Sequence, residues 1–216
     1  MANIAKFTLK ACGHVCAHFE RSVVHGHYSN KDIDESKTQY NVNLAPERPG
    51  GQINYIRNLL SQVSHAKRKD LVCMCSVVVN APSTLPVNMH DRFFRLTYDF
   101  LVDRYGSIAG FEIKEDIVVS CYRHIDESSD HIHFAFCPIK IDQTGRQRFI
   151  AKEVVCRNDL RTLHQDLSNY LSEHGCRADV INGKTQKDAF GRALSVREMK
   201  SRDISNRTHD RTRGRF

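Results

Sequence analysis

The sequence predicts an α+β domain in which helices pack mainly on one face of an antiparallel β-sheet. Strand-like runs alternate with amphipathic helical segments along the chain, and we find no repeat or low-complexity tract. Two apolar runs near the centre, residues 110–122 and 131–141, flank a short polar loop and predict a β-hairpin. Strands broken by helices around a central hairpin are typical of the α+β class.

The N-terminal half supplies two strands and two helical segments. Residues 4–9 alternate as in a strand. Residues 14–21 form a short helix or turn, in which His18 and Arg21, three apart, would share a face. Apolar residues then recur at helical spacing over residues 53–63. Residues 71–79 are a β-branched run, which is typical of a buried strand.

The C-terminal half adds two longer helices. Asn88 is placed to cap a helix whose apolar residues continue to a stop at Gly106. Residues 143–146 have the composition of a turn. Asn158 then opens a second amphipathic helix, which ends at Gly175.

The charge of the chain is uneven. The 216 residues carry a formal charge of +7 and the pI is near 9.0. Residues 192–216 hold seven Arg and one Lys against three acidic residues, a net charge of +5. A basic end indicates a polyanionic partner such as nucleic acid. We expect a catalytic domain over residues 1–200 and a flexible basic tail over residues 201–216.

The eight cysteines are scattered, and several lie in apolar strands, so we expect them to be reduced. The N-terminus carries Lys6 and Lys10 where a signal peptide needs an apolar core, and no apolar run approaches the length of a membrane span. We therefore expect a cytoplasmic protein. Cys12 and Cys16 lack a second pair at zinc-site spacing and are interpreted as small core residues.

The most informative stretch is RHIDESSDHIHFAF, residues 123–136. Successive strand side chains point to opposite faces, so His131 and His133 project from one face while Ile132 points the other way. A bare His-x-His pair is more often found on a solvated sheet face than on a metal. Further metal-binding side chains nearby would favour a metal site over a solvated histidine pair.

Those donors lie just upstream. His124 follows the preceding strand-like segment, and the loop can fold it back as a third nitrogen ligand. An acidic residue, Glu127 or Asp126, lies in the same loop. Three histidines beside one carboxylate would hold a divalent cation and leave coordination positions open, which is the arrangement of a catalytic site.

Residues 124–139 resemble the His-x-Asp-Glu-x-x-Pro-His-x-His signature of the MobV plasmid mobilisation relaxases, also called the Mob/Pre or plasmid recombination family. Residues 13–21, GHVCAHFER, resemble the first motif of this family, in which a His-Asn-x-Arg unit carries the nucleophile. Residues 28–44 resemble the segment that follows it. The likeness covers residues 9–200 and is specific in the order of its motifs.

Three departures from the family pattern stand out. Asp130 occupies the position of the proline, and Phe19 follows the histidine in place of Asn. Residues 41–44, Asn-Val-Asn-Leu, replace Asn-Tyr-Asp-Leu. We expect Asp130, as an added carboxylate near the metal, to change the cation preference.

The resemblance implies a fold of the HUH endonuclease type and site-specific nicking and rejoining of one strand of plasmid DNA at an origin of transfer. His18 matches the nucleophile and would form a 5′-phosphohistidine, with Arg21 clamping the phosphate. Tyr28 and Tyr40 are rival nucleophiles, because other HUH enzymes use tyrosine. Glu127 would be a further ligand, a group that orients a histidine, or the acceptor of the nucleophile's proton.

The expected cofactor is Mn²⁺ or Mg²⁺ held by His124, His131 and His133. The expected partners are plasmid DNA, as a single strand or hairpin, and the conjugation machinery. Candidate DNA contacts are polar residues near the first motif and cations near the C-terminus: Ser29, Asn41, Asn43, Arg192, Arg197, Lys200 and Arg202. The alternatives are an HUH rolling-circle replication initiator, a non-catalytic DNA-binding regulator with a structural metal, and a hydrolase acting on a small substrate.

Overall fold

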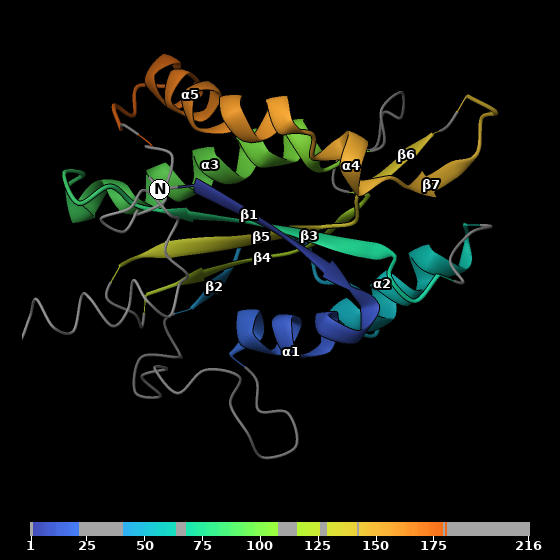
Figure 1. Cartoon of the computed structure of the whole chain (residues 1–216). Coiled ribbons are helices and arrows are strands. Elements are labelled where there is room, and N and C mark those ends of the chain that lie inside the picture. Colours follow the sequence, from blue (N-terminus) through green and yellow to red (C-terminus); the bar gives the residue numbers. More distant parts are fainter. Residues whose placement is uncertain are drawn as a thin grey trace, which may run out of the picture. The chain divides into compact units, whose positions relative to one another are not determined.

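A computed structural model describes residues 2–21, 41–63, 68–107, 116–125, 129–141, 143–178 and 180. Its centre is a five-stranded antiparallel sheet in the order β1-β3-β5-β4-β2 (Figure 1). The strands are β1 (Ala2–Thr8), β2 (Val42–Asn43), β3 (Val72–Asn80), β4 (Val118–His124) and β5 (His131–Phe136). β6 (Ile139–Ile141) and β7 (Gln147–Phe149) form a separate hairpin. The predicted central hairpin is therefore the β4–β5 pair.

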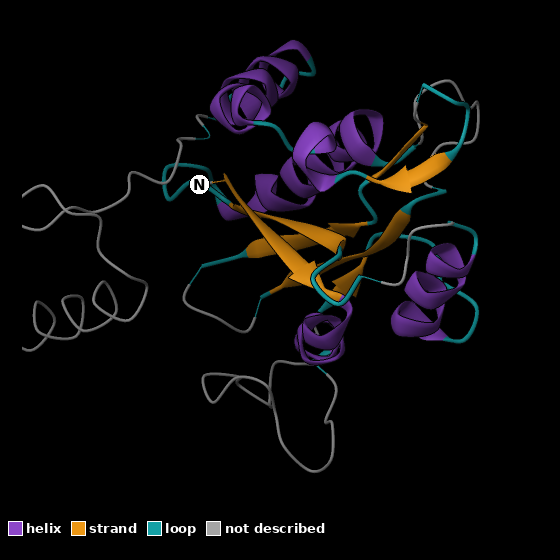
Figure 2. Ribbon diagram, turned by 45° about the vertical axis from the view of Figure 1, so that its right-hand side comes forward, coloured by secondary structure: helices purple, strands orange, loops and turns teal. Residues whose placement is uncertain are grey.

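Helices cover both faces of the sheet. One face carries α3 (His90–Tyr105), α4 (Ala151–Val154) and α5 (Arg157–Glu173), while α1 (Leu9–Glu20) and α2 (Gly51–Ser61) lie on the other (Figures 1 and 2). The predicted α+β class with an antiparallel sheet is confirmed, and α3, α4 and α5 share one face. The other face is covered as well, because α1 and α2 carry apolar stripes of their own.

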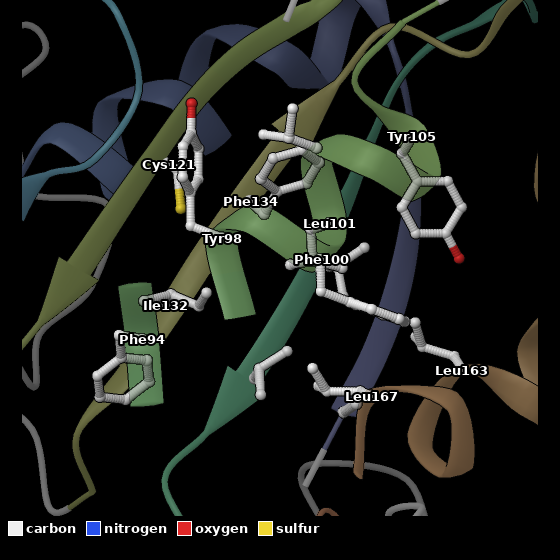
Figure 3. Packing of buried hydrophobic residues seen from close by; sticks show 14 of the residues in the cluster. Phe94, Tyr98, Phe100, Leu101, Tyr105, Cys121, Ile132, Phe134, Leu163 and Leu167 are labelled. Carbon is white, nitrogen blue, oxygen red and sulfur yellow. The ribbon is translucent and has the colours of Figure 1, made fainter. Parts of the chain in front are cut away.

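Each face has its own apolar cluster. The cluster under α3 and α5 contains Phe134, Leu101 and Leu167 among its labelled members (Figure 3). The cluster under α1 and α2 contains Cys12, Cys16, Ile56 and Met74 among others. A sheet with two covered faces keeps its central strands out of water, which is why every residue of β5 is buried.

Alternation along β5 assigns its residues to these two layers. Ile132, Phe134 and Phe136 pack in the α3 cluster, whereas Ala135 packs in the α1 cluster. By the same alternation, His131 and His133 face α1. The predicted orientation of the His-x-His pair is therefore confirmed, and its face is covered by α1 and α2 instead of water.

Two predicted helix starts are placed differently. Asn88 lies in a short 3-10 helix, Val87–Met89, and no side chain caps α3, which begins at His90. α5 begins at Arg157, and its cap is Cys156, whose Sγ accepts from the backbone N–H of Asp159 at 3.5 Å. In both places the apolar periodicity predicted the helix, while the identity of the cap depended on the entering backbone.

Other local predictions are confirmed. The turn at residues 143–146 joins β6 to β7, with Gly145 at a φ of 77°, a conformation that favours glycine. All eight cysteines are free, and Cys12 and Cys16 are buried core residues. Among the described residues, no helix is long and apolar enough to span a membrane. The boundary predicted at residue 200 and the basic tail lie outside the described residues.

Candidate active site

Four histidines from three elements meet at one end of the sheet. His131 and His133 come from β5, and His124, from β4, is the direct cross-strand partner of His131. The ring centroids of His124, His131 and His133 lie 4.7 to 5.2 Å apart. The ring of His18, from α1, lies 5.6 Å from that of His124 and 5.3 Å from that of His133.

Two ring nitrogens of the β5 pair face each other. Nδ1 of His131 lies 2.7 Å from the carbonyl oxygen of Ser129, which can only accept, so Nδ1 carries the proton and Nε2 the lone pair. That Nε2 lies 3.2 Å from Nε2 of His133. Two nitrogens bound about 2.1 Å from one cation would be roughly 3.0 to 3.4 Å apart, so this spacing fits a shared metal ion.

His124 lies beside this pair. Its Nε2–H donates to the carbonyl oxygen of Phe19 at 2.8 Å, which leaves the lone pair on Nδ1. Nδ1 of His124 and Nδ1 of His133 are buried and make no hydrogen bond. Buried polar atoms without partners are costly, and a cation bound at Nδ1 of His124 would satisfy that atom. The residues present therefore fit a metal ion.

Burial also prepares these rings to bind a cation. It lowers the pKa of His124 to about 3, with neighbouring Arg21, His131 and His18 lowering it further. Burial likewise lowers the pKa of His133 far below its ordinary range. Both rings are therefore neutral at physiological pH, as a nitrogen ligand must be.

His18 and Arg21 lie at the C-terminal end of α1, beside this cluster. Arg21 ends the helix with a φ of 55°, and its side chain is buried. Its Nη1 lies 3.3 Å from Nδ1 of His18, so the predicted shared face is confirmed. Among the described residues, a ring nitrogen of His18 lies within 4.8 Å of ligand nitrogens of His124 and His133.

Phe19 contributes to the site in a way that the sequence did not indicate. Its ring stacks on that of His133, with centroids 4.5 Å apart and planes 28° apart, while its carbonyl holds His124. One residue of α1 therefore contacts histidines on two strands. The departure from the family motif at this position could have signalled a special role, but it did not indicate which.

The prediction that Asp130 lies beside the metal is wrong. Its carboxylate accepts from Arg123 and from His90, the first residue of α3. These partners lie on the face that α3 covers, opposite the histidines. Asp130 precedes His131 in the sequence, so it follows the strand's alternation and points away from the cluster.

Two predicted DNA-binding residues are described. Oδ1 of Asn41 accepts from the backbone N–H of Ile125 at 3.2 Å, and Oδ1 of Asn43 accepts from that of Ala45 at 3.1 Å. Asn43 also lines an open hollow of about 280 Å³ together with Glu20. Several predicted residues lie outside the described ranges: Tyr28, Ser29, Tyr40, Asp126, Glu127, Arg192, Arg197, Lys200 and Arg202.

The sequence model of the plasmid recombination enzyme family, Mob_Pre, matches residues 1–190. The chain belongs to this family. The family resemblance that the sequence motifs suggested is therefore confirmed.

Curated family members are longer than this chain. A plasmid recombination enzyme of Bacillus thuringiensis is 28% identical in a 194-position alignment that covers 86% of this chain and 41% of that protein. One from Streptococcus agalactiae is 24% identical in a 217-position alignment, gaps included, that covers 93% of this chain and 40% of that protein. The chain thus spans about two fifths of the length of these relatives.

Solved structures show the same fold. A manganese-bound MobM relaxase domain in complex with plasmid oriT DNA aligns with a TM-score of 0.72 and 23% identity, over 93% of this chain and 97% of that domain. A second crystal structure of that complex gives a TM-score of 0.70 and 22% identity. The relaxase-like fold expected for this family member is therefore confirmed.

Proposed function

We propose that this chain is a DNA relaxase domain that nicks and rejoins one strand of plasmid DNA at an origin of transfer. One observation carries the proposal: His18 and Arg21 lie against a buried cluster of three imidazoles. A nucleophile, a phosphate clamp and a cation site are then within reach of one phosphate. The MobM complex with oriT DNA supports the choice of substrate.

His124, His131 and His133 would hold the cation, and their chemistry favours its identity. Imidazole nitrogens suit transition-metal ions, whereas Mg²⁺ prefers oxygen ligands, so Mn²⁺ is the better match. When bound, the cation would polarise a non-bridging oxygen of the scissile phosphate and offset the charge of the transition state. Glu127 keeps its three candidate roles as ligand, orienting group or proton acceptor.

His18 would act as the nucleophile. A lone pair of its ring attacks phosphorus, an N–P bond forms and the bond from phosphorus to the 3′ oxygen breaks. The leaving 3′ oxygen takes up a proton as the ring loses one, so a 5′-phosphohistidine and a 3′-hydroxyl result. The reaction is reversible because the covalent link retains the energy of the phosphate bond, and rejoining is attack by that hydroxyl.

Arg21 would move from His18 to the substrate. Its guanidinium now lies against Nδ1 of His18. A phosphate would compete for the guanidinium, since a planar donor fork pairs with phosphate more strongly than with a neutral ring. Phosphate binding would thereby release the ring nitrogen of His18.

The wider DNA contacts follow the sequence predictions. We propose that Ser29, Asn41 and Asn43 contact bases or phosphates and that the basic residues Arg192, Arg197 and Lys200 contact the DNA beside the nick. Nicking on a plasmid would take place in the cytoplasm and deliver the strand to the conjugation machinery. A replication initiator would use the same chemistry, but the Mob_Pre match favours mobilisation.

The test is covalent capture of DNA. The protein is incubated with Mn²⁺ and a supercoiled plasmid carrying its own mobilisation region, and adducts that survive denaturation are counted. We expect an acid-labile adduct that His18→Ala reduces at least about 1000-fold, because the nucleophile is lost. Tyr28→Phe and Tyr40→Phe should retain it. His14→Ala is the matched control, since His14 is exposed one turn earlier on α1.

Two outcomes would contradict the proposal. An adduct that persists in His18→Ala and disappears in Tyr28→Phe or Tyr40→Phe would make a tyrosine the nucleophile. If neither Mn²⁺ nor Mg²⁺ supports any nick in cognate DNA that the protein binds, the chain is a DNA-binding regulator with a structural metal.

A further inference from the structure

An ion pair lies directly behind two of the metal-site histidines, on the opposite face of the sheet. Arg123 precedes His124 at the end of β4, and Asp130 precedes His131 at the start of β5. His124 and His131 are cross-strand partners. The ion pair between Arg123 and Asp130 therefore spans the same end of the hairpin as these two histidines.

The carboxylate of Asp130 accepts three hydrogen bonds. Nε of Arg123 donates to Oδ1 at 3.1 Å and Nη2 donates to Oδ2 at 2.6 Å, while Nδ1 of His90 lies 2.9 Å from Oδ2. The side chains of Arg123 and Asp130 are 12% and 9% exposed. The guanidinium also pairs with Asp91 and lies 4.9 Å from the ring centroid of Phe94. The pair is buried and held on several sides.

The backbone beside Asp130 is fixed to the neighbouring strand. The carbonyl oxygen of Asp130 accepts from the backbone N–H of Ala81 at 2.9 Å, and Oγ of Ser129 accepts from Nδ2 of Asn80 at 2.8 Å. The carbonyl of Ser129 is the acceptor that orients Nδ1 of His131. Residues 129 and 130 thus connect the ion pair to the direction of one metal-site ring.

We infer that Asp130 is a positioning residue for the metal centre: paired with Arg123, it fixes the backbone that aims His131 at the cation and sets its spacing from His124. The inference rests on the proposed function. A bidentate pair constrains direction as well as distance. The family signature has proline here, whose ring restricts the backbone, and the ion pair supplies that restraint in this chain.

Stability alone is a weaker explanation of this pair. Taking two charges out of water costs free energy that their attraction offsets only in part, so a buried ion pair adds little net stability over apolar side chains. In contrast, replacing a group that orients a metal ligand commonly weakens metal binding about 10- to 100-fold. Metal affinity is therefore the quantity that separates a positioning role from a merely stabilising one.

The test measures Mn²⁺ affinity by calorimetry in the folded, DNA-free protein. We expect Asp130→Asn to bind Mn²⁺ about 10-fold more weakly than the wild-type chain, because the charged acceptor of the fork is lost. Arg123→Lys keeps the charge and removes the fork, so it should weaken binding in the same direction while staying folded.

The chain offers a matched control in Arg104→Lys. Arg104 also pairs with two aspartates, Asp159 and Asp166, is 21% exposed, and lies 5.7 Å from the ring centroid of Phe100. It connects α3 to α5, away from the histidines. We expect this variant to lower the thermal midpoint about as much as Arg123→Lys and to change Mn²⁺ affinity less than twofold.

A second readout needs no metal. Nitrogen NMR of the histidine rings should show His131 with its proton on Nδ1 in the wild-type chain and on both nitrogens in turn in Asp130→Asn. Unchanged Mn²⁺ affinity in Asp130→Asn, or an equal loss in Arg104→Lys, would overturn the inference. A wild-type chain that binds no Mn²⁺ would contradict the proposed metal centre and not the positioning role. In that case, the same His131 proton position in the wild-type chain and in Asp130→Asn would overturn the positioning role.

Discussion

At the scale of single residues, burial lowers the pKa of two histidines of the site, so that both rings are neutral. His124 and His133 are buried in a cluster of aromatic rings, and Phe19 covers one of them. A buried neutral histidine is a ready metal ligand, but it is also a group that the unfolded chain protonates more easily. The same burial that prepares the site therefore makes the protein sensitive to acid.

We predict that the metal-free protein loses stability as the pH falls from 6.5 to 5. The folded pKa of His124 is about 3, below the unfolded value near 6.5. In this window only the unfolded chain takes up the proton, so lower pH favours unfolding. Each such histidine contributes up to about 1.4 kcal/mol per pH unit. Urea denaturation in EDTA at several pH values measures the slope.

Substitution of His124 tests whether this histidine causes the dependence of the unfolding free energy on pH. His124→Gln should flatten it by about 1 kcal/mol per pH unit, because the group that the unfolded chain protonates is gone. His14→Gln is the control, since His14 is exposed on α1. An unchanged slope in His124→Gln would show that this ring is not held neutral.

At the scale of elements, the two helical layers have different tasks. α1 contributes His18, Phe19 and Arg21 to the histidine face of the sheet. α5 packs with α3 on the other face through residues such as Leu163, Leu167 and Leu171. α5 therefore stabilises the sheet without contacting the four histidines, and its substitutions should separate stability from chemistry.

We predict that Leu167→Ala destabilises the protein without changing the chemistry of the folded form. Leu167 is fully buried under the sheet, and deleting such a side chain costs about 2 to 5 kcal/mol. Below the midpoint of unfolding, adduct formation per folded molecule should equal that of the wild-type chain. Arg161→Ala, exposed on the same helix, should change stability by less than about 0.5 kcal/mol. A loss of adduct at full folding would show that the two layers are coupled.

At the scale of the whole molecule, the charge distribution bears on the proposed DNA binding. The net charge is +7, and residues 192–216 carry a net +5 of it. Each cation that neutralises a phosphate releases counterions, so binding weakens steeply as salt rises. The proposed contacts at the basic end should therefore appear in the salt dependence more clearly than in any single affinity.

We predict that the triple variant Arg192→Ala/Arg197→Ala/Lys200→Ala binds single-stranded origin DNA with a shallower salt dependence. Three lost phosphate contacts on a single strand should change the slope of log K against log salt by about 2. A control with the same charge loss replaces the exposed Lys10, Lys69 and Arg95. Fluorescence anisotropy between 50 and 300 mM salt measures the slope for the triple variant and for the control. Over this range a change of ~0.7 in the slope per lost contact is resolvable. Equal slopes would place the DNA elsewhere.

The sequence by itself determined what is local: the helices and strands, the shared face of His131 and His133, and the shared face of His18 and Arg21. These depend on the 2.0 and 3.6 periodicities, which the chain carries residue by residue. Motif order also indicated the family. Neither the periodicities nor the motif order predicted the helix caps or the role of Phe19.

The tertiary structure alone decided which faces meet. His18 joins histidines more than a hundred positions away because α1 packs across the sheet, and the carbonyl of Phe19 reaches His124 over 105 residues. The prediction for Asp130 was wrong because nearness in sequence was taken for nearness in space. Asp130 directly precedes His131, so its side chain points to the opposite face of the sheet. α3 packs against that face, and its first residue, His90, contacts Asp130. The sequence pattern around the histidines did not predict this contact.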